Sequence, residues 1–221
     1  MALRLRNNKA EQSKISHVYI RSDEHVWIPA LQLKTYGGKA TITTPKFRKE
    51  QEMLNCAKAS KHFKYHDNQQ IPLSDYENDV LPMQNVDVNG NLEEYKDMVD
   101  LAFLSEAAIL YNLKLRHGRE RPYTRTGDVL IAVNPYQWYD DLYTETKRNY
   151  YSNRLVWDSA QSSEDPRSTM EPHVYEVSAL AYKGLVMGSG ENQSILVSGE
   201  SGAGYVPFAN CRATLSQQHY F

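Results

Sequence analysis

The first part of the chain alternates short apolar runs with polar turns, which is the pattern of β-strands. The runs 17–20, 25–29 and 40–44 are rich in β-branched and aromatic residues, and each predicts a strand. Pro29 lacks an amide hydrogen and is expected to confine the end of its strand to a sheet edge. The paired glycines 37–38 predict a tight turn, because glycine adopts positive φ freely. Several short strands in succession predict a small β barrel.

A helix is predicted downstream of these strands. Asn91 has the features of an N-cap, and Glu94, three residues later, would complete a capping box. Apolar residues then recur at helical spacings of three and four, at Leu101, Leu104, Ala108, Tyr111 and Leu115. Gly118 predicts the C-terminal stop. We interpret this segment as a helix that packs against the core.

The last third of the chain predicts an α/β arrangement. The continuous apolar runs 129–133 and 194–198 are typical of strands buried on both faces, as in a parallel sheet. The polar stretch 152–170 predicts a surface loop. A helix is expected to open at residues 171–172 and to end at the glycines 188 and 190. Its apolar face would be Val174, Val177, Ala181 and Leu185.

Composition and charge exclude several classes of protein. Hydrophobic residues are 41%, charged residues 24%, and the net charge is −2, which is ordinary for a globular protein and argues against a nucleic-acid partner. No run approaches the ~18 apolar residues of a membrane span, and the N-terminus has no secretory signal. Two distant cysteines exclude a disulfide framework and favour a reducing compartment.

The balanced charge conceals an asymmetry between the two parts of the chain. Residues 1–70 carry 13 Lys or Arg against 6 Asp or Glu, whereas residues 71–221 carry 12 against 21. The net charges are therefore +7 and −9, and the sign changes near residue 70. This change indicates a domain boundary, or two halves of one domain that attract each other.

The candidate chemistry lies in a glycine-rich turn directly after the run 194–198. Gly199 and Gly204 have the spacing of the two glycines in a phosphate-binding loop, which reads Gly, four residues, Gly, Lys, then Ser or Thr. Such a loop lets backbone N–H groups converge on a phosphate. Its position after a predicted strand and an upstream helix is the context that the motif requires.

These residues, taken together, are recognisable. The segment 192–204, with sequence NQSILVSGESGAG, closely resembles the phosphate-binding segment of myosin motor heads. Upstream, 172–175 (PHVY), 128–136 (DVLIAVNPY) and 104–113 (LSEAAILYNL) resemble other motor segments, and 79–85 (DVLPMQN) resembles the beginning of the motor. The basic β segment before it is similar to the Src-homology-3-like barrel of many myosins. The resemblance runs from about residue 17 to Gly204.

The resemblance implies a domain organisation and a fold. It divides the chain into a disordered N-terminus (1–16), a Src-homology-3-like β barrel (17–75), the N-terminal part of a myosin motor domain (76–204) and an unrelated tail (205–221). The implied fold is a small β barrel followed by an incomplete α/β phosphate-binding-loop NTPase core. The family's activity is ATP-dependent, Mg²⁺-requiring movement on actin, in the cytoplasm and at the cytoskeleton.

The resemblance also assigns site residues, one position at a time. The loop that contacts adenine corresponds to Asn134, Pro135 and Tyr143, with a spacing one residue longer than usual. The phosphate cradle corresponds to Gly199, Glu200, Ser201, Gly202, Ala203 and Gly204. No catalytic residue and no metal ligand is assigned.

The chain departs from the family directly after the cradle. Tyr205 and Val206 stand where the family has Lys and Thr. The Lys would hold the β- and γ-phosphates and the Thr hydroxyl would ligate Mg²⁺, so nucleotide affinity is expected to be weak and turnover absent. The actin-binding surfaces and lever of the family lie beyond Phe221. We therefore expect a truncated, inactive motor fragment.

The sequence also allows two other hypotheses about the chain, and it suggests an origin for the tail. The chain could be a non-catalytic interaction module that acts through its barrel, or it could lack a stable native state because the run 194–198 has an unpaired edge. Gly-Tyr-Val at 204–206 can be encoded by a splice-donor sequence, so the tail 205–221 could be translated intron. A genuine short isoform is the alternative.

Three weaker signals are interpreted as structural. Cys56, His62 and His66 are too few for a typical zinc site and are assigned to packing. The adjacent carboxylates of Asp140 and Asp141 point apart on any regular chain and are assigned to a solvated loop. Glu200 has no water-positioning partner that would support a catalytic base.

Overall fold

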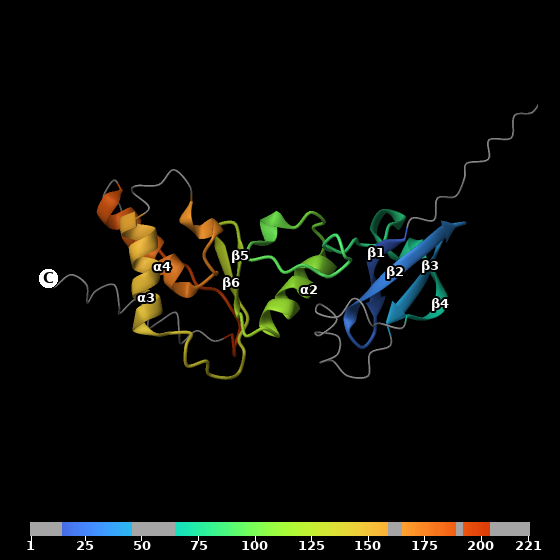
Figure 1. Cartoon of the computed structure of the whole chain (residues 1–221), viewed down its shortest axis with the longest axis horizontal. Helices are drawn as coiled ribbons and strands as arrows, with labels where there is room; N and C mark the ends of the chain where they lie inside the picture. Colours follow the sequence, from blue (N-terminus) through green and yellow to red (C-terminus); the bar gives the residue numbers. More distant parts are fainter. Residues whose placement is uncertain (1–14, 46–64, 159–164, 189–191, 204–221) are drawn as a thin grey trace, which may run out of the picture. The chain divides into compact units, whose positions relative to one another are not determined.

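The structure is a computed structural model that describes residues 15–45, 65–158, 165–188 and 192–203. The chain divides into two compact units (Figure 1). The first comprises Met1–Glu93 with Ala102–Ala108, and the second comprises Glu94–Leu101 with Ile109–Phe221. Residues 76–93 thus group with the strands before them, and the predicted domain boundary at 75/76 stays a prediction.

The first unit is built on an antiparallel sheet of four strands in the order β1-β2-β3-β4 (Figure 1). The strands are β1 (Ser16–Ser22), β2 (Val26–Tyr36), β3 (Lys39–Pro45) and β4 (Tyr65–Pro72). The three predicted strands are confirmed, and each is longer than its apolar run. The sheet agrees with a β-rich N-terminal region, whereas its closure into a barrel stays a prediction.

The β2–β3 turn and Pro29 show how local chemistry sets the sheet. Gly37 and Gly38 have φ of 57° and 74°, and two consecutive positive values match the right-handed twist of a tight hairpin. Pro29 pairs with Tyr19 of β1, and the β2–β3 ladder begins only at Leu31. β2 is central in the sheet, but at its Pro29 end it pairs with β1 alone, so the prediction that Pro29 confines this end of the strand to an edge is confirmed locally.

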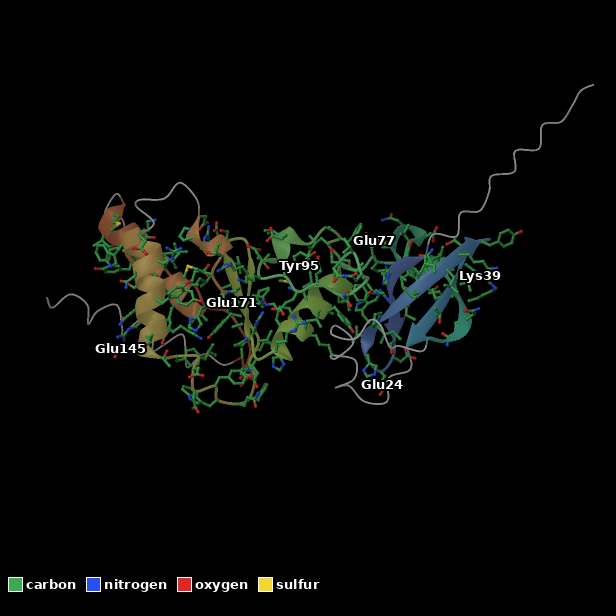
Figure 2. All side chains as sticks on the ribbon, in the orientation of Figure 1. Glu24, Lys39, Glu77, Tyr95, Glu145 and Glu171 are labelled. Atoms are coloured by element: carbon green, nitrogen blue, oxygen red, sulfur yellow. The ribbon has the colours of Figure 1, made fainter. Side chains whose placement is uncertain are left out.

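The core of the first unit lies against one face of this sheet. It consists of Val18, Ile20, Ala30, Ala40, Ile42, Leu73 and Leu81. The segment after the sheet runs beside β1, where Tyr19 N donates to Pro82 O at 2.7 Å and Gln84 N to His17 O at 2.9 Å. The buried Gln84 side chain also donates to the carbonyls of Val18 and Ala30. Glu24, Lys39 and Glu77 lie exposed at the outside of the unit (Figure 2).

The predicted helix exists but begins later than expected. Helix α2 spans Glu106–His117, and Gly118 follows it as predicted. The Ala108 amide donates to Ser105 Oγ at 3.2 Å, which makes Ser105 the N-capping side chain. The cap at Asn91 was wrong, because Asn91 bonds to the Asp87 carboxylate at 2.8 Å in a turn and Glu94 binds arginines. Between Asn91 and α2 the chain forms a 3₁₀ turn, Met98–Asp100, and no α-helix.

In the described residues of the second unit, the strands form a β-hairpin and not the predicted parallel sheet. β5 (Tyr123–Thr126) pairs antiparallel with β6 (Val129–Ala132), and Gly127 turns between them with φ of 62°. The prediction that 129–133 is buried on both faces is wrong, since Val129 is 64% exposed and its neighbours are half-buried. A strand in a two-stranded hairpin has a pairing neighbour on one side only.

Two helices pack together in the remainder of the unit (Figure 1). α3 (Glu145–Ser152) continues into a π-helical turn, Asn153–Trp157, and α4 spans Val174–Met187. Their core is Tyr151, Leu155, Val156, Met170 and Ala179. The loop predicted at 152–170 is therefore wrong for its first residues, whereas α4 and its end at Gly188 were predicted correctly. Only the first residue of the predicted apolar face, Val174, is fully buried, and Leu185 is 44% exposed.

The second predicted buried strand, 194–198, is not formed. Residues 192–200 have no regular secondary structure, and Leu196 is 94% exposed. An apolar run becomes a strand only where another strand supplies its backbone partners, and the described residues offer none to this segment. The parallel α/β core of the fold prediction accordingly stays a prediction.

Candidate functional site

Two segments assigned by the resemblance meet in the second unit. The side chain of Asn134 donates through Nδ2 to Gly202 O at 2.6 Å, across 68 positions of sequence. Asn134 Oδ1 accepts from Tyr136 N at 2.9 Å, which holds Tyr136 at a positive φ of 52°. The loop after β6 and the glycine-rich turn therefore lie next to each other.

A small cavity of about 190 Å³ opens where these segments meet. Its walls include all three residues assigned to adenine (Asn134, Pro135 and Tyr143), together with Trp138, Tyr123 and Ala203 of the glycine-rich turn. Pockets that enclose a whole drug-sized ligand hold roughly 300–1,000 Å³. This cavity suits a single flat ring system whose remaining groups extend outside it.

Aromatic side chains give the cavity its chemistry. Trp138 and Tyr143 lie 5.5 Å apart between ring centroids, and Trp138 is 70% exposed. The hydroxyls of Tyr123 and Tyr143 are hydrogen-bonded at 2.7 Å, and the Tyr175 hydroxyl donates to Tyr143 O at 3.1 Å. Tyr143 is thus fixed by its hydroxyl and its carbonyl, and its ring can offer a planar apolar surface to a base.

The glycine-rich turn is exposed and compact. Residues 199–202 are exposed, and Ala203 N donates to Glu200 O at 3.0 Å to close the turn. Gly202 has φ of 90°, and a Cβ at this position would lie 3.0 Å from the Tyr136 hydroxyl. Glycine is therefore favoured here by its positive φ, while the 83% exposed Tyr136 side chain has room to move away from a Cβ. Gly204, the second glycine of the motif, lies outside the described residues, as do Tyr205 and Val206.

His173 lies beside the cavity, and the sequence analysis did not assign it to the site. It is 2% exposed and caps α4, because its Nδ1 accepts from Tyr175 N at 3.1 Å. Its Nε2 lies 2.9 Å from Leu142 O, to which it donates. Burial lowers the pKa of the imidazole to about 3, while the Leu142 bond opposes the shift and Lys147 adds to it. His173 is therefore neutral at physiological pH. A polar residue directly before a helix start is the signal that could have marked it.

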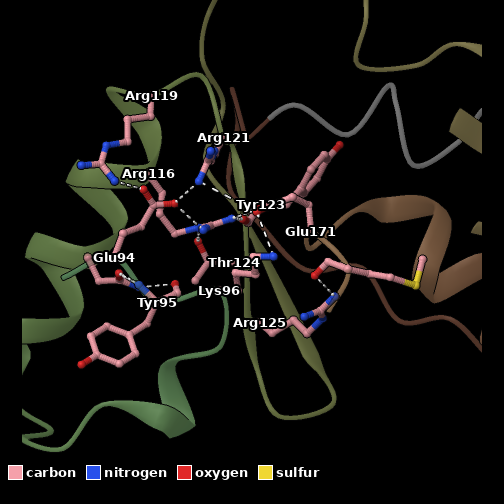
Figure 3. Close-up of polar contacts among 12 residues, drawn as sticks. Glu94, Tyr95, Lys96, Arg116, Arg119, Arg121, Tyr123, Thr124, Arg125 and Glu171 are labelled. Carbon is pink, nitrogen blue, oxygen red and sulfur yellow. Dashed lines mark hydrogen bonds and ion pairs between the residues drawn. The ribbon is translucent and has the colours of Figure 1, made fainter. Parts of the chain in front are cut away.

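A network of buried charges supports the site from β5 (Figure 3). Arg116 of α2 is 1% exposed and donates to Tyr123 O, Thr124 Oγ1, Glu94 and Glu171. Glu94 also accepts from Arg119 and Arg121. Burial favours a higher pKa for the Glu94 carboxyl, but the bonds from Arg119 and Arg121 and the charge of Arg116 outweigh it, so its pKa lies below the ordinary value. The strand that carries Tyr123 is thereby held in place.

A second buried pair joins the hairpin to α4. Arg125 Nε lies 2.9 Å from both Glu176 carboxylate oxygens, and Arg125 also donates to Met170 O at 3.0 Å. Both side chains are nearly inaccessible, at 5% and 6% exposure. Removing one partner of such a pair is strongly destabilising, because the other is left buried and charged. Arg125 and Glu176 do not line the 190 Å³ cavity, whereas both line a larger groove of about 780 Å³ beside β6 and α4.

The weaker candidates of the sequence analysis have different outcomes. Asp140 and Asp141 are exposed, in agreement with a solvated loop. Glu200 is exposed, and its carbonyl closes the glycine-rich turn. Cys56 and His62 lie outside the described residues, as does the side chain of His66. The predicted disordered segment 1–16 also lies outside them, except for Ile15 and for Ser16, which begins β1. Among the described residues, no helix is long and apolar enough to cross a membrane.

Comparison with known proteins gives a consistent result. The family of the myosin head (motor domain) matches residues 95–210, just over half of the chain. Myosin-H heavy chain of Dictyostelium discoideum is 40% identical over 128 residues, which cover 58% of this chain and 6% of that protein. Myosin-2 of Saccharomyces uvarum is 36% identical over 133 residues, covering 60% of this chain and 8% of that protein.

A third relative extends the similarity toward the N-terminus. Myosin-11 of Arabidopsis thaliana is 32% identical over 189 residues, covering 86% of this chain and 10% of that protein. The chain therefore spans a small fraction of the length of these relatives. The family match includes the loop after β6, the cavity and the glycine-rich turn. The resemblance found in the motifs is confirmed, and the chain belongs to the myosin head (motor domain) family.

Proposed function

We propose that the loop 134–143 and the glycine-rich turn 199–204 form the nucleotide-binding edge of a myosin motor. The observation that supports this most directly is the Asn134–Gly202 hydrogen bond of 2.6 Å. It joins the segment assigned to adenine with the segment assigned to phosphate. Both segments lie within the match to the myosin head.

The proposed roles follow from the chemistry of each segment. Pro135 and Tyr143 contact the adenine ring from the aromatic-lined cavity, while Asn134 fixes the loop to the turn. The backbone N–H groups of the glycine-rich turn face the phosphates of ATP. The turn consists of Gly199, Glu200, Ser201, Gly202, Ala203 and Gly204. The phosphate-binding-loop NTPase core and its Mg²⁺ are part of this proposal.

We further propose that Tyr205 and Val206 make this chain a weak ATP binder without turnover. The Lys of the family would form a charged hydrogen bond to the phosphates, and a bond of this kind contributes about 1.5–3 kcal/mol. Val206 has no oxygen for a metal. For the whole protein, the family implies ATP-driven movement on actin at the cytoskeleton. The first unit, which is built on the four-stranded sheet, serves as the Src-homology-3-like domain (17–75) that precedes the motor.

The test restores the two family residues. The double variant Tyr205→Lys/Val206→Thr is compared with the parent chain in a calorimetric titration with MgATP. The added ammonium should tighten binding by about 10- to 150-fold, which is 1.5–3 kcal/mol at 1.4 kcal/mol per tenfold. A matched control, Gln217→Lys/Gln218→Thr, adds the same charge and hydroxyl to the same tail and should not tighten binding.

Two results would contradict the proposal. The first is equal affinity of the restored and control variants, which would attribute binding to general charge. The second is no MgATP binding by any variant at millimolar concentration while the chain remains folded by circular dichroism.

A further inference from the structure

His173 is hydrogen-bonded through both ring nitrogens, to two different segments of the second unit. Nδ1 accepts from the amide of Tyr175 at 3.1 Å and so caps α4. Nε2 donates to the carbonyl of Leu142 at 2.9 Å, in the loop that carries Tyr143. One imidazole therefore joins the start of a helix to the side of the cavity.

Four aromatic rings contact this imidazole. Tyr151 stacks on it at 5.2 Å, Tyr123 meets it edge-on at 5.1 Å, and the rings of Tyr143 and Tyr175 lie at 5.9 Å and 4.6 Å. The enclosure leaves the imidazole one orientation, because a rotated ring would lose both hydrogen bonds.

We infer that His173 is a positioning residue for the loop 134–143: it fixes Leu142, and through it the neighbouring Tyr143, to the N-terminus of α4. This inference rests on the proposed nucleotide-binding function of that loop. Nothing in the resemblance assigned a role to His173.

The path from His173 to the cavity is short and direct. Leu142 and Tyr143 are consecutive, and both line the cavity. Tyr175, whose amide His173 accepts, donates its own hydroxyl to Tyr143 O at 3.1 Å. The first turn of α4 thus holds the carbonyls of both Leu142 and Tyr143. The hydroxyl of Tyr143 is also hydrogen-bonded to that of Tyr123, at 2.7 Å, and this bond adds to the position of its ring.

The arrangement requires a neutral imidazole with its proton on Nε2. A second proton on Nδ1 would face the Tyr175 amide, which is also a donor, and the cap would be lost. The groups that face the ring are the phenols of Tyr123, Tyr143, Tyr151 and Tyr175. Lys147 of α3 also acts against protonation, and burial holds the pKa far below its ordinary value.

Two amide substitutions separate the two bonds. In His173→Asn, the amide oxygen can replace Nδ1 and keep the cap, but nothing reaches Leu142 O. In His173→Gln, the amide nitrogen can replace Nε2 and keep the bond to Leu142, but the cap is lost. The variants are matched in polarity, and both are made in the full chain carrying Tyr205→Lys/Val206→Thr.

Hydrogen exchange of peptides that cover 139–146 and 174–180 reads out the two ends. His173→Asn should exchange about 2- to 10-fold faster in 139–146, the equivalent of one lost hydrogen bond, and normally in 174–180. His173→Gln should show the opposite pattern. MgATP affinity should fall in the Asn variant and stay near the parent value in the Gln variant.

The inference is overturned if both variants loosen both peptides equally, since His173 would then act by packing alone. It is also overturned if 139–146 is unchanged in His173→Asn. These results are separable from failure of the proposed function. If the parent binds no MgATP, the nucleotide proposal fails, while the exchange pattern still decides whether His173 holds the loop.

Discussion

At the scale of single residues, the second unit buries ionisable groups that each have a distinct partner set. Arg116 and Arg125 are charged and satisfied by carboxylates and carbonyls, whereas His173 is neutral and satisfied by the backbone. The physical difference is that a guanidinium cannot lose its proton inside a protein, but an imidazole can. A charged Arg must therefore bring counter-charges, and a buried His need not.

The burial of His173 predicts a loss of stability in mild acid. Its pKa is about 3 in the folded protein and 6.5 when exposed, so the unfolded state binds the extra proton between these values. Stability is complete above pH 6.5 and falls as the pH is lowered, by about 1.4 kcal/mol per pH unit. Between pH 6.5 and 5 the free energy of unfolding should therefore fall by about 2 kcal/mol in urea titrations.

The variant His173→Gln isolates this contribution. Burial also lowers the pKa of His17, so part of the acid sensitivity should persist. The carboxyls of Glu94 and Glu171 titrate below their ordinary pKa values and contribute only at lower pH. If wild type and His173→Gln lose the same free energy between pH 6.5 and 5, His173 is not neutral and buried.

Sequence alone could assign some site residues but not what holds them. The glycine spacing at 199–204 is local, so it is visible in the chain. The Asn134–Gly202 bond joins residues 68 positions apart, and the contacts of Arg116 reach Glu94 and Glu171. No periodic pattern encodes such pairs. His173 was missed because a single buried His between a proline and a helix has the same local signature as any N-cap.

At the scale of elements, helix α2 shows that an apolar period can predict a helix correctly and still place its start wrongly. The exposed fractions of Ala108, Tyr111 and Leu115 are 2%, 4% and 3%, so these residues are buried as the spacing predicts. Leu104 has the same period but is 69% exposed, and it precedes the helix. The apolar period therefore extended by chance across a segment without helical structure. Ser105, in the sequence Ser-Glu-Ala-Ala, supplied the real start signal.

The N-cap assignment predicts the effect of Ser105→Ala. The substitution removes the bond from Ala108 N to Ser105 Oγ and leaves a helix donor without its partner. The free energy of unfolding should fall by about 1 kcal/mol in urea denaturation, within the usual range of 0.5–2. Ser105→Asp keeps an acceptor at this position and should restore most of the loss. Equal destabilisation by Ala and Asp would show that Ser105 does not cap α2.

The two strands predicted in the α/β part show the limit of pattern for sheets. A helix satisfies its backbone internally, so α4 forms where its residues favour it. A strand needs a neighbour from elsewhere in the chain. Residues 129–132 found one in β5, whereas 194–198 are unpaired among the described residues. An apolar run indicates that a segment is suited to burial, but it does not indicate which strand pairs with that segment.

At the scale of the whole molecule, the two compact units differ in how well sequence predicted them. The first is a meander, in which each strand pairs with the next, and local runs and turns predicted β1, β2 and β3. The fourth strand, β4, was not predicted from the sequence. The second depends on contacts between 94–101, α2, β5 and α4. Its identification came from the combination of motifs, each weak alone, that the family match then confirmed over residues 95–210.

The second unit also has an exposed groove of about 780 Å³. Its apolar lining comes from β6, from Val177 and Leu180 of α4 and from residues 193–198, and four charged residues line it as well, Arg125, Asp128, Arg167 and Glu176. Contiguous exposed apolar surface of this kind marks a binding face or an aggregation liability. Leu196, which lines this groove, is 94% exposed.

This exposure predicts that Leu196→Glu improves behaviour in solution at little thermodynamic cost. A side chain already in water contributes almost no burial energy, so the free energy of unfolding should change by less than about 0.5 kcal/mol. Binding of an apolar-surface dye and light scattering on heating should both fall. The matched substitution Ile195→Glu, at the half-buried neighbour that faces the same groove, should cost measurably more stability. A large loss of stability in Leu196→Glu alone would mean that residue 196 is buried in solution, as a strand of a completed sheet would require.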